Sequence, residues 1–291
     1  MPAAELVKEL IDAGIHFGHR VSRWNPKMQP YIFGKRNLIH IVNVKETLKG
    51  ILLAKRFITQ TVGQGKDVLF VGTKRQARKA VESHAQRTNM HSVTDRWLGG
   101  TLTNFREIRK RVGRLEELEK LEAEGMLDAY SKKEGAALRR EMRKILRNLG
   151  GIRNMTKLPG ALVIIDQKRE DIAVKEARKM GIPVVCLLDT DSDPDKVDIP
   201  IPGNDDAMRA IELIIKQMAD AVEEGIRGRA EMMQKEQVDQ QMQQEEQSRR
   251  RSSRPTTTQK YEEADNAESG SEEPDAASEE NQQLPASGGQ E

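Results

Sequence analysis

The fold is decided by the stretch Ala161-Leu162-Val163-Ile164-Ile165-Asp166, a continuous apolar run that ends at a carboxylate. Two similar runs, residues 67–72 and 184–189, lie before and after it. Continuous apolar strands are typical of parallel sheets that are covered on both faces. Helical periodicity follows the first two runs along the chain, over about 76–87 and 170–180. The pattern predicts an α/β body, doubly wound around a mostly parallel sheet that is flanked by helices.

Weaker elements complete the predicted body. Residues 91–93 favour a short strand, and the proline-bearing stretch 199–203 favours a strand at an edge of the sheet. A helix is expected over 44–62, with these residues facing inward: Leu48, Ile51, Leu52 and Ile58. The last helix of the body should place one apolar face on the sheet, made of Met208, Ile211, Ile215, Met218 and Val222.

Residues 105–150 interrupt this alternation of strands and helices, because they contain no strand pattern and are densely charged. Two apolar stripes of matching length flank the glycine-bearing turn around Gly125. The pair Ser131 and Glu134 has the form of a capping box that would begin the second helix, and Gly150-Gly151 would end it. This segment is expected to form an inserted antiparallel helical hairpin of coiled-coil type.

The chain therefore divides into four predicted parts. Residues 1–104 and 151–228 form a discontinuous α/β body, and 105–150 form the hairpin. Residues 229–254 form a polar extension that could continue a helix. Residues 255–291 are rich in Ser, Pro and Glu and are expected to be a disordered acidic tail.

Composition excludes several classes of protein. The chain has 291 residues and one Cys, which excludes a disulfide framework and fits a reducing compartment. No apolar run approaches the ~20 residues that span a bilayer. After Met1 the sequence shows no basic segment followed by an apolar one, which is the pattern of a secretory leader. We expect a soluble cytoplasmic protein with no membrane partner.

The net charge of +2 conceals a division along the chain. Residues 229–291 hold 7 basic and 15 acidic residues, a net charge of −8, so residues 1–228 carry +10. A body this basic favours a polyanionic partner such as nucleic acid, and an acidic tail limits non-specific binding. The alternative is a charged surface that only keeps the protein soluble.

Motifs for nucleotide-dependent catalysis are missing. Gly63-Gln64-Gly65 precedes its strand, whereas a dinucleotide-binding loop must follow one. Gly72-Thr73-Lys74 follows a strand but lacks the glycine-rich loop that cradles phosphates. Cys186 lies inside an apolar strand, where a core role is favoured over a nucleophile. We expect no enzymatic activity and no required cofactor.

One metal site is a weaker expectation. Asp189 ends a predicted strand, and Asp205-Asp206 precede the last helix, so the three carboxylates could meet at the carboxyl edge of the sheet. Together with His19 they could hold a divalent cation. The alternative to a metal site is an ordinary structural role for these residues. Acidic residues complement the dipole at the start of a helix, and Asp-Pro begins turns.

The cations cluster in loops and helix starts, near the few aromatic residues. Arg and Lys bind phosphates, while rings can stack on unpaired bases, so a folded RNA explains this scatter better than duplex DNA. Trp24 lies between two Arg and a Pro and is favoured as a contact over a core role. The predicted RNA-binding residues are Arg20, Arg23, Trp24, Lys27, Lys35, Arg36, Lys74, Arg75, Arg78, Lys79, Arg96, Arg106, Arg109, Lys110 and Arg111.

Several long motifs resemble the bacterial form of the small-subunit ribosomal protein S-two family. They cover roughly residues 6–228, in order and with matching gaps. They are Leu10 to His19, Arg23 to Met28, Phe70 to Arg75, Arg96 to Asn104, Pro159 to Asp166, Glu176, Gly181-Ile182-Pro183, Asp189, Ser192-Asp193-Pro194 and Ile201 to Ala207.

The resemblance implies a structural constituent of the small ribosomal subunit. Such a protein binds small-subunit ribosomal RNA between head and body on the solvent side, contacts other small-subunit proteins and helps recruit ribosomal protein S-one. The acidic cluster would then be a partner or metal site on a protein-facing surface. Two rival hypotheses are a nucleotide-binding α/β protein and a coiled-coil adaptor that acts away from ribosomes.

Overall fold

The computed structural model describes the backbone of residues 3–252, with side chains for 5–127, 129–235, 240 and 242. The chain divides into two units at Glu236, and every contact given below lies within the first. The predicted disordered tail, 255–291, lies outside the described residues.

A five-stranded parallel sheet forms the centre of the body. Its strand order is β5-β4-β6-β7-β8, and each neighbouring pair is parallel. The proline-bearing strand lies at one edge, as predicted, because its prolines cannot donate to a neighbour on both sides. The strands are β4 (Val68–Val71), β5 (His91–Val93), β6 (Ala161–Ile165), β7 (Val184–Leu188) and β8 (Ile199–Pro202).

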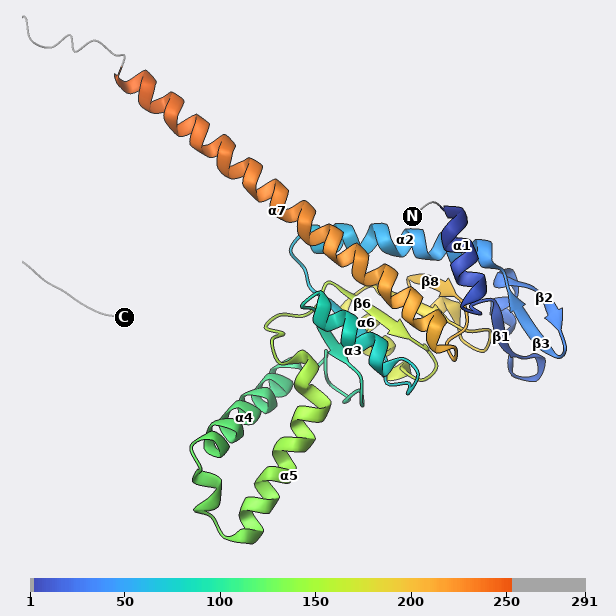
Figure 1. Cartoon of the computed structure of the whole chain (residues 1–291), viewed down its shortest axis with the longest axis horizontal. Coiled ribbons are helices and arrows are strands. Elements are labelled where there is room, and N and C mark those ends of the chain that lie inside the picture. Colours follow the sequence, from blue (N-terminus) through green and yellow to red (C-terminus); the bar gives the residue numbers. More distant parts are fainter. Residues whose placement is uncertain (1–2, 253–291) are drawn as a thin grey trace, which may run out of the picture. The chain divides into compact units, whose positions relative to one another are not determined.

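Helices cover both faces of this sheet (Figure 1), so the doubly wound fold is confirmed. Side chains alternate along each strand: Phe70 and Val163 join one core cluster, while Leu69 and Leu162 join the other. The first cluster includes residues of α1 (Ala3–Asp12), α2 (Val44–Gly63), α3 (Arg78–Arg87) and α7 (Met208–Ser252). The second includes α6 (Asp171–Met180) and the base of the helical hairpin.

Two inward-facing predictions were wrong. Leu52 is 54% exposed and Met208 is 67% exposed. On α2 the buried stripe runs through Gly50 and Ile51 instead, because β8 packs against Gly50, where a Cβ would meet the Pro200 carbonyl. On α7 the buried stripe begins at Ala210 and Ile211, and the partly buried Ala207 just before the helix packs against the same core, which leaves Met208 outside it.

The predicted helical hairpin is present. Helices α4 (Phe105–Ala123) and α5 (Lys132–Leu149) lie side by side and are joined through a 3-10 turn, η3 (Met126–Asp128). The capping box is formed, because Ser131 and Glu134 each bond the other's backbone N–H. At its base, Arg147 Nε lies 3.1 Å from Asp95 Oδ2. These contacts fix the hairpin in the connection between β5 and β6.

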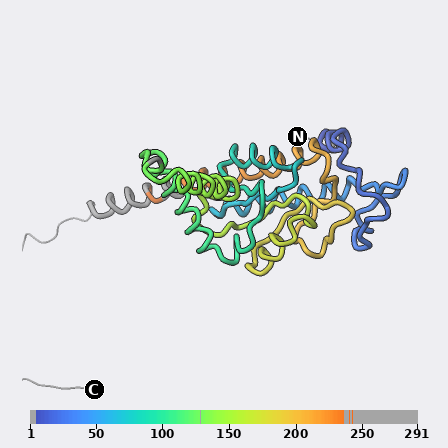
Figure 2. Tube along the Cα trace, turned by 90° about the horizontal axis from the view of Figure 1, so that it is seen from below, coloured from blue at the N-terminus to red at the C-terminus, as the bar shows by residue number. Residues whose placement is uncertain are grey.

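A second, smaller sheet was not anticipated. It is antiparallel, has the order β1-β3-β2, and lies at the opposite end of the body from the hairpin (Figures 1 and 2). Its strands are β1 (Phe17–Arg20), β2 (Ile32–Arg36) and β3 (Ile39–Val42). Short 3-10 turns complete the chain: η1 (Val21–Arg23), η2 (Pro26–Tyr31), η4 (Gly150–Ile152) and η5 (Pro194–Lys196).

The polar extension expected after residue 228 continues α7 as far as Ser252. Among residues 3–252, no helix combines the length and apolarity that crossing a membrane would require.

Candidate nucleic-acid interface and acidic cluster

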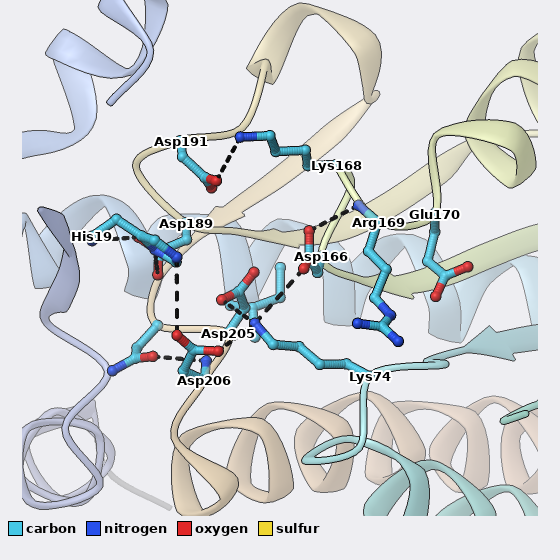
Figure 3. Close-up of polar contacts among 12 residues, drawn as sticks. His19, Lys74, Asp166, Lys168, Arg169, Glu170, Asp189, Asp191, Asp205 and Asp206 are labelled. Carbon is cyan, nitrogen blue, oxygen red and sulfur yellow. Dashed lines mark hydrogen bonds and ion pairs between the residues drawn. The ribbon is translucent and has the colours of Figure 1, made fainter. Parts of the chain in front are cut away.

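The predicted acidic residues meet at the carboxyl edge of the parallel sheet (Figure 3). Asp189 follows β7, and Asp205 and Asp206 follow β8. His19 reaches them from β1 of the small sheet, which lies close to the strand ends because Gly18 has no side chain. A Cβ at Gly18 would lie 2.6 Å from Thr190 Cγ2. The close approach of the two sheets therefore creates the cluster.

His19 is held firmly by Asp189. Its Nδ1 lies 2.8 Å from Asp189 Oδ2, and its backbone N–H donates to Asp189 Oδ1 at 3.1 Å. Its Nε2 lies 3.9 Å from Asp206 Oδ2. The hydrogen bond to Asp189 raises the pKa of His19 to about 9, against the lowering effect of burial. The ring orientation is thus set by a carboxylate, with Nε2 turned toward Asp206.

Lys74 enters the same cluster from the end of β4. Its Nζ lies 2.8 Å from Asp205 Oδ1, 2.6 Å from Asp206 Oδ1 and 3.7 Å from Asp166 Oδ2. Burial alone would lower the pKa of Lys74, but the charge of Asp205 and hydrogen bonds to both carboxylates raise it. Burial, with the charges of Asp166 and Asp189, raises the pKa of Asp205 to about 7. The cluster carries more negative than positive charge even with Lys74 present.

A second buried carboxylate lies where β4 and β6 end side by side. Glu170 accepts hydrogen bonds from the backbone N–H of Thr73, at 3.0 Å, and from its hydroxyl, and Arg169 Nε donates to the same hydroxyl at 3.1 Å. Burial raises the pKa of Glu170, although the bonds to Thr73 oppose the shift. Doubly wound proteins bind ligands at this point of the sheet. In this chain, the side chains of Glu170, Thr73 and Arg169 are hydrogen-bonded to one another at that point.

The acidic cluster has the donor set of a metal site. One possible ligand atom from each of His19, Asp205 and Asp206 lies within 4.8 Å of the other two. Histidine ligands commonly donate their second ring N–H to a carboxylate, as His19 does to Asp189. In such a site, Asp189 would orient His19 rather than coordinate the ion.

The predicted RNA-binding cations fall into three groups. Four are engaged with carboxylates: Lys27, Lys74, Arg78 and Lys110. Arg109 donates to the Arg153 carbonyl at 2.7 Å. Within the described part of the chain, the other cations are exposed and have no carboxylate within ion-pair distance: Arg20, Arg23, Lys35, Arg36, Arg75, Lys79, Arg96, Arg106 and Arg111.

The two tryptophans differ in burial and in their partners. Trp24 is half-buried, with its ring 5.2 Å from that of His40. Trp97 is buried and its Nε1 donates to Glu176 at 3.1 Å. Sequence reasoning did not assign Glu176 a role, although its carboxylate also accepts the backbone N–H groups of Gly100, Leu102 and Thr103. Glu176 thus shapes the loop that presents Arg96.

Residues 10–225 match the family model described as Ribosomal protein S2. This segment contains the cluster, the hairpin and every predicted RNA-binding residue. The chain belongs to the ribosomal protein S2 family.

Curated relatives agree with the S2 assignment. The chain is 57% identical to small ribosomal subunit protein uS2 of Rhodopirellula baltica over 220 residues, which cover 76% of this chain and 85% of the relative. It is 52% identical to small ribosomal subunit protein uS2 of Syntrophobacter fumaroxidans over 233 residues, 80% of this chain and 84% of the relative. The family resemblance inferred from the sequence motifs is confirmed.

Proposed function

We propose that this S2-family chain is a structural, non-enzymatic constituent of the small ribosomal subunit in the cytoplasm. It binds small-subunit ribosomal RNA at the junction of head and body, next to other small-subunit proteins. The observation that carries the proposal is the set of exposed cations that lack a carboxylate partner among the described residues. Lys74 is left out of this set, because it is buried against three aspartates.

The mechanism is electrostatic docking. Each free Lys or Arg that reaches a phosphate releases a condensed counterion. The logarithm of the binding constant therefore falls linearly with the logarithm of the salt concentration. The free cations lie on the small sheet, the start of α3, the 96–104 loop and the start of α4. A partner that contacts all of these must be folded, which supports ribosomal RNA over an extended strand.

A filter-binding series tests this function directly. The full chain is titrated with small-subunit ribosomal RNA from about 50 to 200 mM salt, where six to ten phosphate contacts would lower the affinity about 10³- to 10⁵-fold. Sucrose gradients of cell extract should place the protein with small subunits. A flat salt response, or protein that stays at the top of the gradient, contradicts the proposal and favours an adaptor acting away from ribosomes.

A thermal-shift comparison separates this function from the nucleotide-binding alternative. ATP, GTP or NAD should stabilise the chain no more than sulfate does. Stabilisation by one nucleotide well beyond sulfate would instead favour a ligand at the carboxyl edge of the sheet.

We further propose that the chain helps recruit ribosomal protein S-one to the subunit. The support is its membership of the S2 family. Small subunits reconstituted with and without this protein are sedimented with purified S-one. S-one should remain in the subunit fraction only when this chain is present, and equal retention in both samples contradicts the role.

We also propose that His19, Asp205 and Asp206 hold a divalent cation, which would supply positive charge to a cluster with an excess of carboxylates. Zn²⁺ suits a site of one imidazole and two carboxylates. Zinc binding is measured by equilibrium dialysis on the full chain and on Asp206→Asn. The matched control is Asp220→Asn, which removes an exposed carboxylate that pairs with Arg87. Asp206→Asn should weaken zinc binding at least about tenfold, and equal affinities contradict the site.

A further inference from the structure

The loop that follows β4 lies where doubly wound proteins usually bind a ligand. The chain runs from β4 to β5 on one side and from β6 to β7 on the other, so the sheet changes direction between β4 and β6. Phosphates bind at such points through backbone N–H groups near the start of the next helix. In this chain, residues 72–77 lead from β4 into α3, and the carboxylate of Glu170 reaches them from the start of α6 (Figure 3). A carboxylate of the chain itself therefore takes the place of an anionic ligand.

Thr73 is hydrogen-bonded at each of its polar atoms. Its backbone N–H and its hydroxyl both donate to Glu170 Oε1, the first at 3.0 Å. The hydroxyl oxygen accepts from Arg169 Nε at 3.1 Å, and the backbone carbonyl accepts from Arg78 Nε at 3.2 Å. Thr73 and Glu170 are both buried, so loss of one partner would leave the other unsatisfied. These bonds fix the loop at residue 73.

The turn that brings Glu170 to the loop contains a residue in an uncommon conformation. Asp166, directly after β6, has a φ of +67°, in the left-handed region that favours glycine. Its Oδ1 accepts the backbone N–H of Arg169 at 3.1 Å, and its carbonyl accepts the backbone N–H of Glu170 at 3.1 Å. Such a conformation persists when its surroundings over-determine it, and it is typical of functional positions. The turn thus holds Glu170 against the end of β4.

The fixed position of Thr73 sets the directions of the residues that follow it. Lys74 turns inward to the acidic cluster. Arg75 is exposed, and Lys79 follows in the first turn of α3 and is also exposed. Neither of these two has a carboxylate within ion-pair distance in the described part of the chain. Two unpaired cations therefore extend from a loop that Glu170 holds in place.

We propose that Glu170 is a positioning residue for ribosomal RNA binding, because it holds the 72–77 loop so that Arg75 and Lys79 reach phosphates together. The inference deepens the proposed function and rests on it. Glu170 acts through the hydrogen bonds that it accepts and does not touch the RNA. Both bonds from Thr73 end on Oε1, so an amide oxygen at the same place can accept them. The expected sign is opposite to that from net charge, since loss of this acidic residue weakens RNA binding.

Glu170→Ala is compared with the loss of a carboxylate elsewhere. Affinity of the full chain for small-subunit ribosomal RNA is measured across a salt series for Glu170→Ala, Glu170→Gln and Glu224→Ala. Glu224 is exposed on α7 and has no ion-pair partner within the described residues. Glu170→Ala should weaken binding and reduce the salt slope by about 0.7–1.8, the share of one or two phosphate contacts. Glu170→Gln should keep the unsubstituted slope, and Glu224→Ala should bind at least as tightly as the unsubstituted chain.

A double-mutant cycle with Arg75→Gln tests whether the effect passes through the loop. Arg75→Gln alone should reduce the slope by about 0.7–0.9. In the Glu170→Ala background the same substitution should have a smaller effect, because the contact of Arg75 is already weakened. Equal reductions in both backgrounds would overturn the proposal. An unchanged slope in Glu170→Ala, or equal losses in Glu170→Ala and Glu170→Gln, would also overturn it.

Further measurements separate positioning from folding. A merely structural role would lower the melting temperature of Glu170→Ala and leave the salt slope of the folded protein unchanged. If Glu170→Ala does not fold, Thr73→Val takes its place, since it removes the hydroxyl and keeps the size of the side chain. Thr73→Val should then reduce the slope, and an unchanged slope overturns the proposal. If the unsubstituted chain shows no salt-dependent binding, the proposed function itself fails.

Discussion

The two sheets of this molecule use their polar residues in opposite ways. At the carboxyl edge of the parallel sheet, Lys74 is enclosed by Asp166, Asp205 and Asp206. On the antiparallel sheet, Lys35 and Arg36 are exposed and have no carboxylate partner among residues 3–252. The cation at the first sheet is paired within the chain, whereas these two cations of the second sheet are not.

Under the proposed function, this contrast separates cations that are available to a polyanion from a cation that is not. The fold class alone would direct attention to the carboxyl edge of the parallel sheet, because ligands of doubly wound proteins bind there. In this chain that edge holds paired charges and connects the two sheets through His19. The small sheet, which has no counterpart in the doubly wound pattern, carries free cations on its strands, and the others lie around α3, the 96–104 loop and α4.

The largest effect, on the free energy of unfolding, is expected from a comparison of two phenylalanines. Phe70 lies in the middle of β4 with no exposed surface, while Phe33 is 80% exposed. Phe70→Ala should lower the free energy of unfolding by about 3–5 kcal/mol, because it leaves a cavity in the core. Phe33→Ala should change it by no more than about 0.5 kcal/mol. Denaturant unfolding of both variants measures the difference. Similar losses would mean that the small sheet also depends on its aromatic ring for stability.

The second comparison concerns two lysines that are paired with aspartates. The Lys74 side chain is 11% exposed, and Lys168, 3.0 Å from Asp191, is 63% exposed. Lys74→Met leaves buried carboxylates without their cation and should cost about 3 kcal/mol. Lys168→Met should cost at most about 1 kcal/mol, because solvent screens that pair. Adding Asp205→Asn to Lys74→Met should recover part of the loss. A neutral effect of Lys74→Met would show that water already solvates the cluster.

A third prediction concerns the loop that presents Arg96. Burial would raise the pKa of Glu176, but hydrogen bonds from Gly100, Leu102, Thr103 and Trp97 outweigh it and lower the pKa. A depressed carboxylate pKa stabilises the fold above the ordinary value of about 4.5, and this contribution is lost as pH falls through the folded pKa. Glu176→Gln should therefore cost about 1–3 kcal/mol near neutral pH.

The difference in unfolding free energy between the unsubstituted chain and Glu176→Gln, followed from pH 7 downward, checks this sign. It should shrink as the pH drops below the ordinary glutamate value. A difference that stays constant with pH would mean that the loop needs the shape of the side chain and not its charge. The matched variant Glu223→Gln, which alters an exposed partner of Arg87, should show little effect at any pH.

The parallel sheet could be predicted because each strand is a local apolar run, such as 161–165. The meeting of Asp189 with Asp205 could be predicted because parallel strands end at a shared edge. The small sheet could not be predicted, since its strands contain Gly, Lys and Arg and two bulges. These features break the alternation of apolar and polar residues that marks a strand. The burial of Lys74 depends on Asp205, 131 residues away along the chain, and no local pattern records that pairing.

The smallest effect expected separates two exposed lysines that differ only in their surroundings. Lys35 lies in the acid-free segment 13–45, whereas Lys216 on α7 lies four residues from Glu212 and from Asp220. Neither has a carboxylate within ion-pair distance in the described residues, so Lys→Gln at each should change stability by no more than about 0.5 kcal/mol. Lys35→Gln should reduce the salt slope of ribosomal RNA binding by about 0.7–0.9, the share of one phosphate contact. Lys216→Gln should leave the slope unchanged, because the carboxylates next to Lys216 repel the phosphate backbone of the RNA. Equal reductions would mean that RNA also reaches α7, and the expected difference between Lys35 and Lys216 would then be wrong.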